Sequence, residues 1–160
     1  MIIIRIAFLL LSIFGCSVSS FSQSLKSILP TPDSTIFTNP KPNAENIIEK
    51  YVISYFNVTQ PTEVLERVSN VEGTWDCHTR TEYGNISIDT YTCDMQLEQT
   101  IRFENYTYEE VNRIARFLLK DDEFNKWIDN RFEPIDATAG CFLEIKDGGN
   151  TTIIEYGCSD

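Results

Sequence analysis

The chain has 160 residues, with 24 acidic side chains against 13 basic ones and a formal net charge of −11. A chain this acidic repels nucleic-acid phosphates and anionic lipid surfaces, so its composition argues against nucleic-acid binding. The same acidic charge is compatible with binding to a basic protein partner. The length suffices for one domain with its own hydrophobic core.

Residues 1–22 have the pattern of a cleaved secretory signal peptide. Arg5 precedes an uncharged stretch that ends in small residues, and Ser20-Phe21-Ser22 fits a cleavage site before Gln23. The strongly apolar part covers only residues 6–16, whereas a membrane-spanning helix needs about 20 residues. We therefore expect a secreted chain without a membrane span. Arg5 is the only charged residue removed, so the mature chain would have a net charge of −12.

A second interpretation of this region rests on Cys16. Ile13-Phe14-Gly15-Cys16 resembles a bacterial lipobox, in which the cysteine is lipidated after cleavage. Under the signal-peptide interpretation Cys16 is lost, and the odd count of five cysteines becomes even. Four cysteines then remain to form two disulfides: Cys77, Cys93, Cys141 and Cys158.

Residues 23–43 contain four of the six prolines, which predicts a flexible, extended tether. A single α+β domain is expected over residues 44–160. A helix is predicted in NAENIIEKYVISYFN (43–57), where apolar side chains recur at helical spacing. A second, short helix is predicted in TQPTEVLERVSN (59–70), because Pro61 suits a first helical position.

Strand composition follows over residues 73–103, which are rich in Thr, Tyr and Ile and alternate with polar residues. Gly84-Asn85 supplies a turn, and a third strand is expected at residues 95–103.

The next stretch predicts another helix. Thr107 and Glu110 have the spacing of a capping box, and Phe124, Trp127 and Ile128 continue a helical pattern after a break near Asp121. The sequence thus predicts an α+β fold. It would have three to four helices, and an antiparallel sheet with two disulfide-stapled hairpins.

The last hairpin has a register that its cysteines favour. A turn on Gly149-Asn150 places Cys141 opposite Cys158, whereas a turn on Gly148-Gly149 keeps the faces but separates the two cysteines. We favour the first register. It also opposes two apolar pairs on one face, Leu143 with Tyr156 and Ile145 with Ile154.

The earlier hairpin allows the same plan. A three-residue loop centred on Asn85 opposes Cys77 to Cys93, Trp75 to Met95 and Thr79 to Tyr91. The favoured disulfides are therefore Cys77–Cys93 and Cys141–Cys158. The alternative is a disulfide that joins one hairpin to the other.

Four N-x-S/T sequons stand in the chain, each at a predicted turn or helix end. Asparagine also favours turns without any glycan, which is the plainer explanation. We interpret the pattern as that of a eukaryotic secreted glycoprotein rather than a bacterial exported protein. The candidate asparagines are Asn57, Asn85, Asn105 and Asn150.

The ending Cys-Phe-x5-Gly-Gly-Asn-Thr-Thr-x4-Gly-Cys, residues 141–158, resembles the closing segment of small cysteine-rich extracellular modules. It resembles the ET module of nematode secreted proteins and, more distantly, three-finger domains. The resemblance covers residues 77–158 and is specific only in the last eighteen. It implies an extracellular binding module without catalysis.

Residues with catalytic or metal-binding chemistry are few. His78 is the only histidine, and adjacent strand residues point to opposite faces, so it would not meet Cys77. The acidic run Asp121-Asp122-Glu123 lacks the ligand spacing of a calcium loop. Trp75 and Trp127 are expected in the core. We predict no catalytic, cofactor-binding or metal-binding residues.

The sequence supports one functional hypothesis over two others. The favoured one is a secreted, non-enzymatic binding module whose partner is an unidentified protein. The main alternative is an exported bacterial inhibitor or immunity protein that masks a secreted enzyme or toxin. A small hydrolase that uses two carboxylates is the third.

Overall fold

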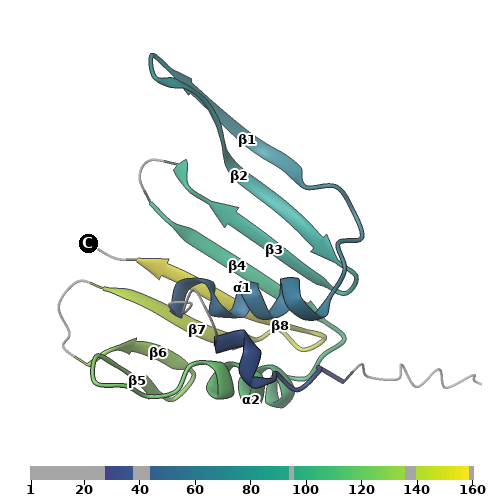
Figure 1. Cartoon of the computed structure of the whole chain (residues 1–160), viewed down its shortest axis with the longest axis vertical. Coiled ribbons are helices and arrows are strands. Elements are labelled where there is room, and N and C mark those ends of the chain that lie inside the picture. Colours follow the sequence, from purple (N-terminus) through teal and green to yellow (C-terminus); the bar gives the residue numbers. More distant parts are fainter. Residues whose placement is uncertain (1–27, 38–43, 94–95, 136–139, 159–160) are drawn as a thin grey trace, which may run out of the picture.

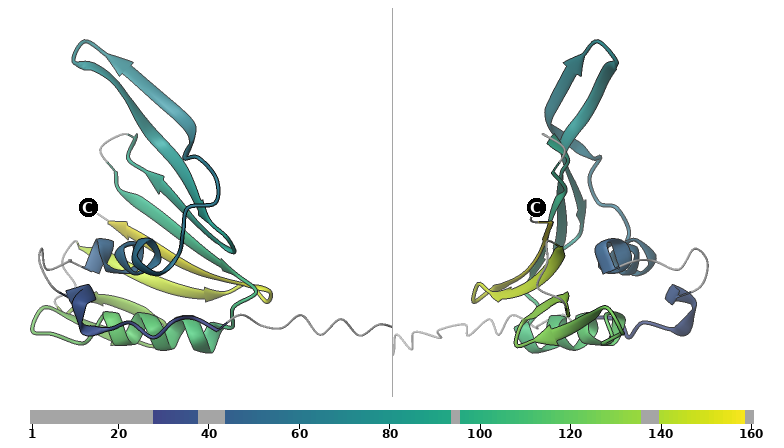
Figure 2. Two further views of the ribbon diagram at one scale, coloured as in Figure 1. Left: turned by 45° about the vertical axis from the view of Figure 1, so that its right-hand side comes forward. Right: turned by 90° about the vertical axis from the view of Figure 1, so that its left-hand side faces the viewer.

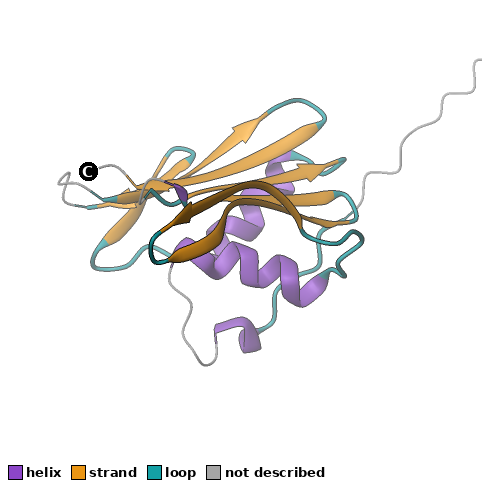
Figure 3. Cartoon of the chain, turned by 90° about the horizontal axis from the view of Figure 1, so that it is seen from above, coloured by secondary structure: helices purple, strands orange, loops and turns teal. Residues whose placement is uncertain are grey.

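The protein, as a computed structural model, is an α+β domain built on one antiparallel sheet of eight strands (Figure 1). The structure describes residues 28–37, 44–93, 96–135 and 140–158; the expected signal peptide and Cys16 lie outside them. The helices lie on one face of the sheet (Figure 3). In chain order the elements are η1 (Ser34–Phe37), α1 (Ala44–Tyr55), β1 (Glu63–Asn70), β2 (Gly73–Tyr83), β3 (Ile86–Tyr91), β4 (Glu98–Glu104), α2 (Tyr108–Leu118), β5 (Asn125–Ile128), β6 (Arg131–Pro134), β7 (Cys141–Asp147) and β8 (Thr151–Cys158).

The sheet consists of two halves with the same plan. Each half is a helix followed by four consecutive strands, and the strand order is β1-β2-β3-β4-β8-β7-β6-β5. The halves meet where β4 pairs antiparallel with β8, with Ile101 opposite Ile154. Backbone hydrogen bonds across this β4–β8 seam therefore make one continuous sheet from two local meanders.

The core lies between the helices and one face of the sheet. Alternate residues of β4 and β8 are buried, as expected for strands with one covered face. Tyr51 and Val52 of α1 are fully buried. The buried residues of α2, namely Val111, Ile114, Ala115 and Leu118, follow the predicted helical spacing, and its predicted capping box at Thr107 and Glu110 is confirmed.

Part of the segment expected as a tether packs on the domain. Leu29 and Ile36 are buried members of the core. The Tyr51 hydroxyl donates a 2.7 Å hydrogen bond to the Pro30 carbonyl, and the Asp33 backbone N–H donates one of 2.8 Å to the Tyr55 hydroxyl. Residues 28–37 therefore lie against α1, while residues 38–43 lie outside the described part.

The helix predicted over residues 59–70 is wrong. Residues 63–70 form strand β1, which pairs antiparallel with β2 from Glu63 opposite Arg80 to Asn70 opposite Gly73. Pro61 and three apolar residues suggested a helix, but pairing with a distant strand decided the conformation. This is the usual way in which tertiary contacts override a weak local preference.

The helical continuation near Phe124–Ile128 is also wrong, since β5 and β6 form a short hairpin there. The Asp122 carboxylate accepts hydrogen bonds from the backbone N–H groups of Phe124 and Asn125, and Asp121 accepts one from Trp127. Aspartate side chains that bind nearby backbone N–H groups compete with the helix and favour turns. The described residues thus contain two α-helices and one short 3-10 helix rather than three to four helices.

The predicted register is correct for the C-terminal hairpin and wrong for the first hairpin. The C-terminal register is confirmed: Cys141 lies opposite Cys158, Leu143 opposite Tyr156 and Ile145 opposite Ile154. In the first hairpin the loop is one residue shorter than predicted. Tyr83 lies opposite Ile86, and Gly84 in the turn adopts a φ of 66° that glycine tolerates without strain. Thr79 therefore faces Thr90 and not Tyr91, and Trp75 faces Val68 of β1.

Candidate contact surface

A two-stranded ribbon projects past the rest of the sheet. β3 pairs with β2 only from His78 to Tyr83, whereas β1 continues to pair with β2 as far as Gly73. Residues 67–76 therefore have no strand neighbour on the β3 side, and Figures 1 and 2 show them extending beyond the domain. We call these residues the ribbon.

Cross-strand contacts order the ribbon. The Arg67 Nε donates to the Asp76 carboxylate at 2.5 Å, and the Ser69 and Thr74 hydroxyls lie 2.8 Å apart. At the tip, the Asn70 Oδ1 accepts hydrogen bonds from the backbone N–H groups of residues 72 and 73, at 2.7 and 3.2 Å. Side-chain bonds of this kind fix a turn without a hydrophobic core beneath it.

The ribbon exposes apolar side chains within acidic surroundings. Val71 at the tip has a relative exposure of 103%, and Trp75 has 40%. The expectation that Trp75 lies in the core is therefore wrong, whereas Trp127 packs against the core and donates from Nε1 to the Leu119 carbonyl at 2.7 Å. β1, the tip and the first half of β2 carry one basic residue, Arg67, against four acidic ones: Glu63, Glu66, Glu72 and Asp76.

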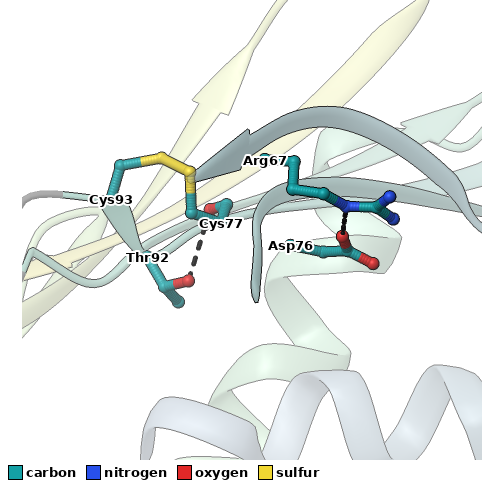
Figure 4. The surroundings of a disulfide bond; sticks show 5 residues. All are labelled: Arg67, Asp76, Cys77, Thr92 and Cys93. Atoms are coloured by element: carbon teal, nitrogen blue, oxygen red, sulfur yellow. Dashed lines mark hydrogen bonds and ion pairs between the residues drawn. A yellow bond between two sulfur atoms is a disulfide. The ribbon is translucent and has the colours of Figure 1, made fainter. Parts of the chain in front are cut away.

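A disulfide anchors the base of the ribbon. Cys77 is bonded to Cys93, both are buried, and the Cys77 carbonyl accepts hydrogen bonds from the Thr92 N–H and hydroxyl at 2.6 and 3.3 Å (Figure 4). The two cysteines meet despite the shifted register because Cys93 lies just past the end of β3. Glu66 lies near both sulfur atoms, but sulfurs bonded to each other offer no thiolate to a metal ion.

The uncovered face of the sheet carries a cluster of three charges. Asp89 on β3 accepts two hydrogen bonds from Arg80, at 2.7 and 3.1 Å, and a third from Arg102. Burial of Asp89 opposes its ionisation, but the hydrogen bonds and charges of the two arginines outweigh that effect. The pKa of Asp89 is consequently held below its usual value.

We expect Asp89→Asn to lower the free energy of unfolding by about 2 kcal/mol at neutral pH, since hydrogen bonds to charged groups contribute about 1.5–3 kcal/mol. Because the folded-state pKa of Asp89 is lowered, its contribution is fully present above about pH 4. It is lost as the pH falls through the lowered pKa. Urea unfolding from pH 3 to pH 7 measures the difference.

The control for this variant is Glu98→Gln, which removes an exposed carboxylate from the same face. It should change the free energy of unfolding by less than about 0.5 kcal/mol. An Asp89→Asn variant that is as stable as the wild type at pH 7 would contradict the role given to the cluster.

A polar groove of 410 Å³ adjoins this cluster at the β2–β3 turn. Arg80 and Arg102 line it, but both already pair with Asp89, and two further carboxylates, Glu82 and Glu104, face the same space. The groove therefore has no surplus of positive charge with which to hold a phosphate or sulfate group.

The structure also describes the other residues that the sequence analysis considered as candidate functional groups. The His78 ring packs edge-on against Tyr91 at 5.6 Å between centroids. Asp121 and Asp122 accept backbone hydrogen bonds, as described above. Cys141 is bonded to Cys158, so both disulfides join the pairs that the sequence favours. Asn57, Asn85, Asn105 and Asn150 are all exposed.

Sequence reasoning missed the ribbon because it assigned residues 59–70 to a helix. A signal was present: two runs with β-branched residues flank the turn at residues 70–73, which ends in glycine.

Comparison with protein-family models, with curated proteins and with solved structures found no match. Within the described ranges, no helix has both the length and the apolar character needed to cross a membrane. What this chain does is therefore inferred from its own surface chemistry.

Proposed function

We propose that this chain is a secreted, non-enzymatic binding module that contacts an extracellular protein through the ribbon. One observation carries the proposal: the ribbon holds Val71 fully exposed at an ordered tip, with Trp75 partly exposed beside it. Burial of exposed apolar surface in a partner's hollow is favourable, and tryptophan is enriched among residues that dominate binding energy.

The charge of the ribbon defines the kind of partner. The ribbon carries two carboxylates, Glu72 and Asp76, and one arginine, Arg67, and the whole chain has a net charge of −11. A partner with an apolar hollow and a basic rim is complementary to this pattern. Such complementarity mainly raises the association rate and excludes acidic competitors.

The covalent chemistry supports an extracellular setting. Two disulfides within one domain are consistent with an oxidising compartment. The signal-peptide pattern of residues 1–22 and the resemblance of residues 141–158 to cysteine-rich extracellular modules favour the same setting.

The same ribbon favours one alternative function. A narrow projecting hairpin can enter the cleft of a secreted enzyme or toxin, as an exported bacterial inhibitor or immunity protein would require. The two functions differ in the partner: under the alternative, binding abolishes an enzymatic or toxic activity. Lipidation at Cys16 would also favour the alternative.

Val71→Glu is expected to weaken partner binding at least tenfold without unfolding the protein. The side chain makes almost no contact within the chain, so its replacement leaves the free energy of unfolding within about 0.5 kcal/mol. A carboxylate placed in an apolar hollow should weaken binding at least tenfold, which corresponds to about 1.4 kcal/mol. The measurement is retention of a partner from native extracellular fluid on immobilised protein, followed by titration with the purified partner.

The matched control is Val58→Glu, which places the same charge at a valine with 56% exposure far from the ribbon. This variant should bind as the wild type does. If Val71→Glu binds the purified partner as tightly as the control, the ribbon is not the contact surface.

A further inference from the structure

The four sequon asparagines lie together at one end of the sheet. Asn85 stands in the β2–β3 turn, Asn105 follows β4, and Asn150 stands in the β7–β8 turn. The Glu104 N–H donates to the Asn85 carbonyl at 2.8 Å, and the Asn105 N–H donates to the Asn150 carbonyl at 3.0 Å. Three sequons from distant parts of the chain therefore form one hydrogen-bonded group.

The fourth sequon, Asn57-Val58-Thr59, joins the same end. The Thr59 N–H donates to the Glu82 carbonyl at 2.9 Å, and the Gly84 N–H donates to the Thr59 hydroxyl at 3.1 Å. This fixes the segment after α1 beside the β2–β3 turn. In Figure 1 these turns lie at the right-hand side, and the ribbon extends away from them.

The side chains of these asparagines differ from those of the other asparagines that the structure describes. Among the described residues, the amides of Asn57, Asn85, Asn105 and Asn150 make no side-chain hydrogen bond. Outside the sequons, the asparagines whose side chains the structure describes each make at least one: Asn70, Asn112, Asn125 and Asn130.

This contrast bears on why the sequon asparagines are there. Asparagine retained only for turn chemistry typically uses its side chain to bond the nearby backbone, as Asn70 does. The sequon asparagines instead leave their amide groups exposed to solvent. Asn105 also has a backbone reason for its place, with a φ of 64°, but the other three have no positive φ.

We propose that these four asparagines carry N-linked glycans, which together cover the sequon end of the sheet and direct the ribbon outward. In the modification, the Asn Nδ2 bonds to the C1 atom of the first sugar of a polyprenyl-pyrophosphate-linked oligosaccharide. The C1–O bond to the pyrophosphate breaks, the lipid pyrophosphate leaves, and one amide proton passes to a base of the transferase. The inference rests on the proposed secretion of the chain.

The polar groove beside Asn85 is where the first sugars of the glycan on that residue would lie. Asn85 and Ser87 of one sequon line it together with Arg102. The first sugars on Asn85 would lie over a surface rich in hydrogen-bonding groups, where their hydroxyls find polar partners. The groove thus holds the protein's own carbohydrate rather than an external ligand.

The first experiment is peptide mass spectrometry of the protein isolated from its native source, before and after treatment with peptide-N-glycosidase. We expect sugar on all four asparagines, and conversion of each to aspartate by the enzyme. Unmodified asparagines in the native protein would overturn the glycan proposal. Partner binding that is still lost with Val71→Glu would then leave the function of the ribbon standing.

The second experiment adds one glycan at the other end. Glu72→Thr completes a sequon at Asn70 in the ribbon tip, and attachment at Nδ2 leaves Oδ1 free to accept the two backbone hydrogen bonds of the turn. After secretion from eukaryotic cells, this variant should bind the purified partner at least tenfold more weakly. The control Glu72→Ala removes the same carboxylate but completes no sequon, so the glycan's effect is the tenfold weakening of Glu72→Thr relative to this control.

The matched variant replaces all four native sequon asparagines by glutamine. It should bind the partner within about twofold of the wild type, because its changes lie at the end opposite the ribbon. If it loses binding while Glu72→Thr retains it, the sequon end is the contact surface, and the proposed orientation is wrong.

Discussion

Replacing Cys77 and Cys93 together by alanine is expected to lower the free energy of unfolding by about 3 kcal/mol and to mobilise the ribbon. The bond closes a loop with a sequence separation of 16, and losing it enlarges the unfolded ensemble. Both cysteines are also buried at the point where the ribbon leaves the sheet. Urea unfolding measures the stability, and amide hydrogen exchange over residues 67–76 measures the mobility.

The second disulfide supplies a control of almost equal loop length. The Cys141–Cys158 bond has a sequence separation of 17, so its removal should cost a similar free energy. It lies across β7 and β8, away from the ribbon. Hydrogen exchange in residues 67–76 should therefore stay unchanged in this variant. Equal acceleration of that exchange in both variants would mean that Cys77–Cys93 does not anchor the ribbon.

Ile154→Ala is expected to lower the free energy of unfolding by about 3–4 kcal/mol, within the range of about 2–5 kcal/mol for isoleucine truncation in cores. Ile154 is 2% exposed and lies opposite Ile101 on one side and Ile145 on the other. Truncation would leave a cavity at the β4–β8 seam, where close-packed neighbours relax only partly. Chemical denaturation with a two-state fit measures the change.

Ile153→Ala provides the comparison within the same strand. Its side chain points to the uncovered face, lies opposite Arg102 and Lys146, and is only half-buried. We expect a loss below about 1 kcal/mol. A loss as large as that of Ile154→Ala would contradict the assignment of core and uncovered faces.

The predictable parts of the fold are those whose conformation depends on interactions between residues that are close in the sequence. Cysteines at both ends of the last hairpin, with a turn between them, leave one register in which Cys141 meets Cys158. The start of α2 was equally predictable, because Thr107 and Glu110 bind each other's backbone N–H groups within one turn of helix.

Other parts depend on contacts between distant segments. The apolar residues in 63–70 also fit a short amphipathic helix, and pairing with β2 makes this segment a strand. The β2–β3 register was missed by one residue because Gly84 allows a tighter turn than the one assumed. Leu29 and Ile36 were assigned to a tether because prolines surround them, although their own apolar character suits a core.

The features of the candidate site also fall into those that the sequence predicts and those that depend on the folded structure. The identities of the sequon asparagines and of the paired cysteines can be read from the sequence alone. Their placement cannot, because it needs the strand order that brings Asn85, Asn105 and Asn150 to one end. The exposure of Trp75 is a similar case. Tryptophan is highly buried on average, and the projection of the ribbon leaves this one partly in solvent.

The β4–β8 seam has a consequence for how copies of the chain can associate. Residues 44–104 and 108–158 each form one half, a single link at residues 105–107 joins them, and each disulfide lies within one half. No covalent cross-link in the described residues holds the seam closed. If the link straightened, β4 of one copy could pair with β8 of another through the same contacts, so that two copies would exchange halves. Such an exchanged dimer would carry two ribbons and could engage two partner molecules at once.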